Sequence, residues 1–255
     1  PRETHITGSI DVHEMAIDSK GRLIFVATDL SCLAVLDPVH SFRPIWKPPF
    51  IAEITPGDRC HMNGLGMVDG RPKYVTCVSQ TDVEQGWHGR PLPKGVIVDV
   101  ETDRIVTDKL SMPHSPRLVG DKIYAVDSGR GFLVEVDPAS GDVTDVVFCP
   151  GFLRGLEIVG KHAVVTVSKP RYETFEGLPI GEEMERRRAK PMCAVMIIDL
   201  TSRKIVEWLT LEGYVKELFT AVMMPGITCP SSIGPTADNF PTKITFDPRI
   251  EPLVY

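Results

Sequence analysis

The sequence lacks the features that mark several large classes of protein. Its six cysteines are scattered and no two form a CxxC pair, which excludes zinc-ribbon and thioredoxin-like chemistry. No apolar run approaches the ~20 residues of a membrane-spanning helix, and no signal peptide is visible. No GxSxG motif occurs, so the nucleophile elbow of the α/β-hydrolases is absent. Free cysteines inside apolar runs suit a reducing compartment, and the expected location is the cytoplasm.

Basic residues are also in the minority. The chain has 28 Lys and Arg against 34 Asp and Glu, which gives a net charge of −6 at pH 7. Nucleic-acid binding needs a basic face, so neither nucleic acid nor a membrane is expected as the partner. The hydrophobic fraction of 42% is ample for a packed core. A small-molecule substrate is the partner that this composition leaves open.

One pattern recurs along the chain: a short polar segment becomes apolar and leads into a β-rich run. The copies begin near His13, His61, His114 and Arg154, with a weaker fifth copy at Val215–Phe219. Each of the first four is followed by further strand-like runs that are rich in β-branched residues and bounded by turn residues. An aspartate ends the third strand of each repeat, where an Asx turn suits a hairpin. These aspartates are Asp37, Asp99, Asp137 and Asp199.

Four antiparallel strands in every 40 to 60 residues predict an all-β fold, a β-propeller of four-stranded blades. A β-sandwich is the rival, and the repeating register favours the propeller. The interpretation is a single propeller domain over residues 1–255. Its complete blades are expected at about residues 9–50, 59–110, 111–148 and 152–211, with a partial blade at 212–255.

The sequence is compatible with two ways of closing the ring of blades. Residues 4–10 can act as the outer strand of a last blade, to which Lys243–Asp247 would add another strand. Alternatively, one or two blades are missing and lie on a cleaved segment or on a second chain.

Two insertions, at residues 79–94 and 169–193, interrupt the repeat, and the second contains a predicted short helix near Glu182–Lys190. Both fall between the second and third strands of a blade. In an up-and-down blade that connection lies on the face where the first strand begins. We therefore expect both insertions to rise over the channel mouth where the recurring polar residues enter. Long loops at one end of a rigid scaffold commonly carry function.

Several stretches resemble a bacterial family of conserved hypothetical proteins that is defined as a domain of unknown function. The resemblance covers about residues 8 to 230 and implies a propeller-like fold. It brings no established activity and no catalytic residues. Members of that family are longer at the N-terminus, which favours missing blades over a five-bladed ring. The stretches are Ser31–Leu33, Ser41–Phe50, Arg59–Leu65, Ser111–Arg117 and Pro150–Leu156.

The first candidate site is a metal centre in the channel. His13, His61 and His114 begin three successive blades, and convergent neutral imidazoles can bind zinc, iron or copper. Glu217 or Asn63 can add an oxygen ligand, and an open coordination position would permit catalysis. Alternatively, these histidines hydrogen-bond the backbone between blades.

The second candidate is metal-free acid–base work by the same ring of residues. His114, Arg154 and Glu217 are the expected catalytic residues, with the arginine as a clamp for an anionic substrate. A serine nucleophile would pair with His114 or Lys169, although a propeller supplies no nucleophile elbow. The residues expected to line the substrate site are Asn63, Asp127, Ser168, Lys169 and Trp87.

The sequence thus predicts a small-molecule enzyme with a histidine-rich site at the channel mouth. Metal-assisted hydrolysis or oxidation is the expected reaction, by a metal-dependent hydrolase or oxidoreductase. The alternative is a non-enzymatic binding platform, in which Trp87 and Phe175–Leu178 would hold a ligand or a partner protein.

The metal hypothesis predicts near-stoichiometric zinc, iron or copper in the purified protein, measured by elemental analysis. Imidazole ligands on rigid strands hold such a metal through purification. Metal-free protein that retained full activity would contradict the hypothesis.

Overall fold

The computed structural model describes residues 4–89, 94–175 and 177–231, together with Gly234, Asp238 and Arg249. The chain divides into two compact units, of which one is His5–Met223 and the other combines Pro1–Thr4 with Met224–Tyr255. The first unit contains every helix and strand of the described residues. In the second unit, residues 224–231 contain neither helix nor strand.

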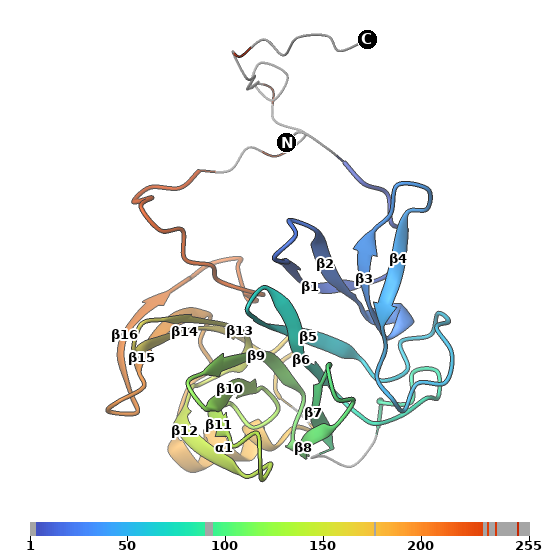
Figure 1. The fold of residues 1–255 in the computed structure, drawn as a ribbon. Coiled ribbons are helices and arrows are strands. Elements are labelled where there is room, and N and C mark those ends of the chain that lie inside the picture. The colour runs from blue at the N-terminus through green and yellow to red at the C-terminus, as the bar shows by residue number, and fades with distance from the viewer. Residues whose placement is uncertain are drawn as a thin grey trace. The chain divides into compact units, whose positions relative to one another are not determined.

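Four four-stranded antiparallel sheets make up the first unit, each with its strands in chain order (Figure 1). The first sheet contains β1 (Val12–Ile17), β2 (Leu23–Ala27), β3 (Cys32–Leu36) and β4 (Phe42–Trp46). The second contains β5 (Met62–Val68), β6 (Arg71–Cys77), β7 (Gly95–Asp99) and β8 (Ile105–Leu110). The third contains β9 (Pro113–Val119), β10 (Lys122–Asp127), β11 (Phe132–Val136) and β12 (Val143–Phe148). The fourth contains β13 (Phe152–Val159), β14 (His162–Ser168), β15 (Ala194–Asp199) and β16 (Lys204–Thr210). These sheets are the blades of a β-propeller, as the repeat predicts.

The turn between the third and fourth strands of each blade is closed by an aspartate, and this prediction is confirmed. Asp137 is typical, because its Oδ1 accepts the backbone N–H groups of Ala139 and Ser140 at 2.8 and 3.0 Å. Equivalent pairs of bonds are accepted by Asp37, Asp99 and Asp199.

The apolar core lies between successive blades. Alternating side chains on the two faces of each sheet allow one sheet to pack against both of its neighbours. Burying one such aliphatic side chain contributes roughly 1.5–3 kcal/mol. Fully buried residues that share an inter-blade cluster are Leu33 with Val75, Ile97 with Val134, and Leu133 with Leu153.

The first strand of each blade is the inner one, and neighbouring inner strands contact each other in the order β1, β5, β9, β13. Glycine makes the approach of β5 to β9 possible. A Cβ atom on Gly64 would lie 2.2 Å from Thr76 Oγ1 and 2.8 Å from the backbone nitrogen of Ser115. A Cβ atom on Gly66 would lie 2.4 Å from the carbonyl oxygen of Pro116. The close packing of these strands brings the beginnings of the blades to one channel.

The fifth inner strand that the sequence predicts at Val215–Phe219 is not formed. The segment lies beside the end of β14, where Ser168 Oγ donates to Leu218 O at 3.2 Å and accepts Leu218 N–H at 3.0 Å. Lys169 N–H donates to Lys216 O at 2.8 Å. Because the Ser168 side chain bonds both the N–H and the carbonyl group of Leu218, this segment does not form the regular backbone hydrogen bonds of a strand.

Two further segments, residues 4–10 and Lys243–Asp247, were expected to form strands that close the propeller. Residues 4–10 contain no strand, and Lys243–Asp247 lie outside the described residues. The predicted helix in the second insertion is present as α1 (Pro179–Arg187), three residues earlier than expected. It begins early because proline suits the first turn of a helix, and it ends at Arg187 because the next residue, Arg188, has a left-handed φ of 52°. No helix within the described ranges has both the length and the apolarity to cross a membrane.

We expect Gly64→Ala to lower the free energy of unfolding by about 2–4 kcal/mol, because the added methyl group meets backbone on β9. Gly181→Ala is the matched control. It lies in α1, its Cβ would approach no atom closer than 3.4 Å, and alanine favours a helix by about 1 kcal/mol. Urea unfolding of both variants measures the difference, and a Gly64→Ala variant as stable as the native protein would contradict the close packing.

Candidate active site

One cavity of about 400 Å³ lies at the channel mouth and is lined by the recurring polar residues. His13 comes from β1, His61 from the residue before β5, His114 from β9 and Arg154 from β13. Both insertions contribute to the same cavity, through Trp87 and Arg171 respectively. The remaining lining residues are Asp11, Val12, Met112, Phe152 and Phe219.

His61 is held by an acidic partner. Its Nδ1 lies 2.8 Å from Asp58 Oδ2, which also accepts the Trp87 indole N–H at 2.9 Å. The indole packs on the His61 ring with centroids 4.2 Å apart. Because an ionised carboxylate only accepts, the proton of neutral His61 is on Nδ1 and the lone pair is on Nε2.

His13 has the same tautomer for a different reason. Its Nδ1 lies 2.8 Å from Thr28 Oγ1, and the Thr28 hydroxyl donates to the carbonyl oxygen of Met62 at 2.6 Å. A hydroxyl has one proton, so Thr28 must accept from His13 Nδ1–H. The His13 and His61 rings meet edge to face with centroids 4.8 Å apart. Two imidazoles with unprotonated Nε2 atoms therefore share the cavity wall.

His114 differs because both of its ring nitrogens have protein partners. Its Nδ1 donates to the carbonyl oxygen of Met112 at 2.9 Å. Its Nε2 lies 3.2 Å from Asn63 Nδ2, and Thr76 fixes that amide by donating to Asn63 Oδ1 at 2.7 Å. Ser128 Oγ lies 2.9 Å from Nδ1 as well. The His114 imidazole therefore forms hydrogen bonds between the second and third blades. The catalytic role expected for His114 stays a prediction.

Two arginines face one carboxylate at the edge of the cavity. Arg154 lies 3.2 Å from Glu217, and Arg171 Nε lies 3.0 Å from each of the two Glu217 oxygens. The Arg154 guanidinium also lies over the Phe152 ring at 5.4 Å, and its buried Nε has no hydrogen-bond partner. Burial and the neighbouring Arg171 lower the pKa of Arg154, which nevertheless stays charged.

Burial lowers the pKa of two of the imidazoles, His13 and His114. Burial, and then the nearby His61, lower the pKa of His13. Burial, and then the charges of Arg154 and His61, hold the pKa of His114 well below its usual value. Both rings are therefore bases rather than cations at neutral pH.

The other predicted residues are distributed over three places. Trp87 lines the cavity and Asn63 lies behind it against His114, whereas Ser168 and Lys169 line a neighbouring pocket. Asp127 lies outside both pockets: it accepts Ser111 N–H at 2.8 Å and pairs with Arg130 at 3.1 Å. Burial raises the pKa of Asp127 to about 6.

Sequence reasoning missed Asp58, Thr28 and Arg171. Asp58 precedes His61 by three residues and has a left-handed φ of 39°, a turn that directs its carboxylate back to the ring. Its spacing from His61 was a usable signal. Thr28 and Arg171 gave none, because their contacts to His13 and Glu217 depend on the fold.

Of the three histidines predicted as metal ligands, His13 and His61 have an Nε2 atom that could bind a metal ion, whereas both ring nitrogens of His114 have protein partners. Over the described ranges, no three His, Cys, Asp or Glu side chains are grouped closely enough to hold a metal ion. His13 and His61 would have to share a metal with a ligand from water or substrate, and the metal hypothesis stays a prediction.

Removing Arg154 should raise the pKa of His114, and that of His13 by less. The Arg154→Gln variant loses the positive charge that opposes protonation, and this charge acts more strongly on His114. NMR titration of the histidine ring protons measures both midpoints, with Arg43→Gln, on the exposed β4 edge, as the control. In the native protein both midpoints should lie below 6.5, and a His114 midpoint at or above 6.5 would contradict its burial as a neutral base.

The same shift makes stability depend on pH. The unfolded chain binds a proton on His114 near pH 6.5 while the folded protein does not, so the unfolding free energy should fall as pH drops below about 6.5.

Comparisons with solved structures give low similarity. Hydrazine synthase of Kuenenia stuttgartiensis matches with a TM-score of 0.45 and 12% identity, over 83% of this chain and 52% of that chain. Glutaminyl cyclase of Myxococcus xanthus matches with a TM-score of 0.46 and 12% identity, over 80% of this chain and 72% of that chain. The chain thus spans about half the length of the hydrazine synthase chain it matches. No curated protein matches the sequence.

A family model described as a domain of unknown function, DUF4915, matches residues 1–233. This match covers most of the chain and agrees with the resemblance found in the sequence motifs. The chain belongs to the DUF4915 family.

Proposed function

We propose that the cavity at the channel mouth is the active site of an enzyme that acts on a small anionic substrate by histidine acid–base chemistry. One observation carries the proposal. His13 and His61 line the same cavity, and each has its Nδ1 proton engaged, which leaves Nε2 as a free base.

Hydrolysis is the reaction class that these groups support best, because water is its only co-reactant. His61 Nε2 takes a proton from water while the water oxygen bonds to an acyl carbon of the substrate. The bond to the leaving group then breaks, and the leaving group takes the proton from the imidazolium. Asp58, 2.8 Å from Nδ1, stabilises that imidazolium and fixes the ring orientation.

His13 assists as the second member of a pair. Its ring lies 4.8 Å from that of His61, and a positive charge on His61 lowers the pKa of His13. While His61 holds the proton taken from water, His13 therefore stays neutral and can accept a hydrogen bond from the substrate through Nε2. Arg154 and Arg171 provide the positive charge that binds the substrate anion.

A metal-assisted form of the same reaction uses the same two atoms. A divalent zinc, iron or copper ion on the Nε2 atoms of His13 and His61 would activate the water in place of a general base. Elemental analysis separates the two forms, because only the metal-assisted form needs a bound ion.

We expect His61→Gln to abolish turnover, because it removes the base. Asp58→Asn should reduce turnover by about 10²- to 10⁴-fold, because it removes the carboxylate that orients the base and stabilises its imidazolium. The measurement is incubation of the protein with a metabolite extract, followed by mass spectrometry of consumed and formed compounds. His40→Gln, on an exposed loop of the first blade, is the control and should leave turnover unchanged.

Full turnover by His61→Gln would overturn the proposal. A protein that turns over nothing but retains a stable partner from native extract would support the binding platform instead.

A further inference from the structure

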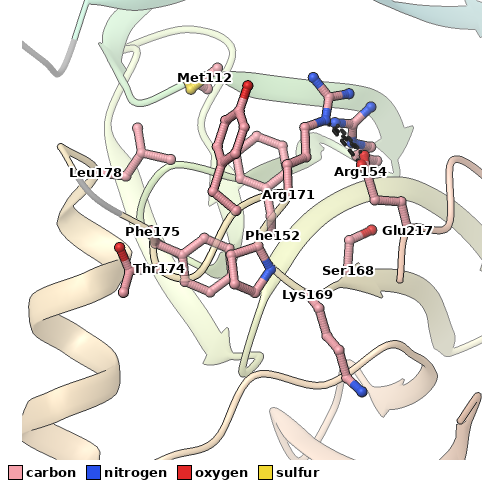
Figure 2. Close-up of a pocket in the computed structure, with 12 residues that line it drawn as sticks. Met112, Phe152, Arg154, Ser168, Lys169, Arg171, Thr174, Phe175, Leu178 and Glu217 are labelled. Carbon is pink, nitrogen blue, oxygen red and sulfur yellow. Dashed lines mark hydrogen bonds and ion pairs between the residues drawn. The ribbon is translucent and has the colours of Figure 1, made fainter. Parts of the chain in front are cut away.

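A second pocket, of about 210 Å³, opens beside the active-site cavity. The two share four lining residues: Met112, Phe152, Arg154 and Arg171. Figure 2 shows Phe175 and Leu178 on one side of this pocket, Phe152 in the middle, and Arg154, Arg171 and Glu217 gathered at the other side. The pocket is thus apolar at the end lined by Phe175 and Leu178, and the end that meets the catalytic cavity carries the two guanidinium groups beside Phe152 and Met112.

The second insertion builds the apolar end and has a core of its own. Phe175, Ile180 and Met184 are buried together, and Phe152 and Leu178 pack against them. Ile180 N–H donates to the carbonyl oxygen of Gly129 at 2.8 Å, which fastens α1 to the third blade. The wall is therefore part of a packed structure, and its shape exists before a ligand binds.

The charged end has one carboxylate for two guanidinium groups. Glu217 pairs with both Arg154 and Arg171, while the buried Arg154 Nε has no partner. In Figure 2 the Lys169 side chain extends away from the two arginines. Two guanidinium groups therefore share one carboxylate at the junction of the two cavities, where an anionic group of a ligand would be a second partner for them.

We propose that the substrate is an amphipathic carboxylate with its anionic group on Arg154 and Arg171, its aromatic or alkyl group in the second pocket, and its reacting group toward His61. This inference rests on the proposed function and adds the substrate class. The volume sets the size: a buried apolar cavity of about 150 Å³ holds benzene, so 210 Å³ suits one ring or a chain of roughly six to eight carbons.

Calorimetric titration of 3-phenylpropionate tests the proposal without any knowledge of the reaction. We expect it to bind at least about tenfold more tightly than acetate, which lacks the ring, and than 3-phenyl-1-propanol, which lacks the charge. Equal binding of acetate, equal binding of the alcohol, or no binding of 3-phenylpropionate would overturn the inference.

Two variants locate the ligand. Arg171→Gln removes one guanidinium from an exposed side chain, and Thr174→Trp adds bulk at the exposed rim of the second pocket. Each should weaken binding of 3-phenylpropionate by about tenfold or more, while the control Arg43→Gln should not change it. Circular dichroism checks that each variant is folded. Native affinity in folded Thr174→Trp would place the ligand elsewhere and overturn the inference.

The His61→Gln variant separates this inference from the proposed function. His61 does not line the second pocket, so the variant should bind 3-phenylpropionate with native affinity. Native binding together with full turnover by His61→Gln would overturn the proposed function and leave the ligand class standing. If the protein bound 3-phenylpropionate no more tightly than acetate or the alcohol, while turnover still depended on His61, the ligand class would be overturned and the proposed function would stand.

Discussion

Hydrogen bonds link each blade to the inner strand of the next blade, and they stabilise both the fold and the site. Thr28 donates to Met62 O, the side chains of Asn63 and His114 meet, and Ser115 donates to Arg154 O at 2.9 Å. A buried polar group left without a partner costs about 1–3 kcal/mol, so the blades must align for these bonds to form. The same alignment fixes the tautomers of His13 and His114. The packing of the blades therefore determines which nitrogen of each of these two imidazoles carries the proton.

The architecture was open to prediction because it depends on local and periodic signals. Strand alternation, Asx turns and the spacing of four repeats define the blades, and the structure contains four four-stranded sheets in those places. Four of the predicted site residues were chosen in the same way. Because His13, His61, His114 and Arg154 occupy equivalent places in the repeat, the propeller brings them to one cavity. Periodicity therefore predicted both the blades and the convergence of these four residues, while their role in catalysis stays a prediction.

Contacts that do not follow the repeat could not be predicted from the sequence. The stretch Val215–Phe219 has the apolar character of a strand, but the hydroxyl of Ser168 takes both backbone groups of Leu218. Asp127, expected to line the substrate site, is the last residue of β10, and its carboxylate pairs with Arg130 instead of entering the cavity. In each case a single long-range or turn contact decides the outcome, and such a contact leaves no period in the sequence.

The same cavity holds two arginines and two imidazoles of lowered pKa, those of His13 and His114, and the proposed function links these groups. The charge of Arg154 helps to keep the pKa values of His13 and His114 low. A substrate anion beside Arg154 would cancel part of that charge, so the imidazoles would become better bases when the substrate is bound. By reciprocity, a protonated imidazole would strengthen anion binding by the same free energy. In the empty cavity, His13 would then be a weaker base than in the complex with substrate.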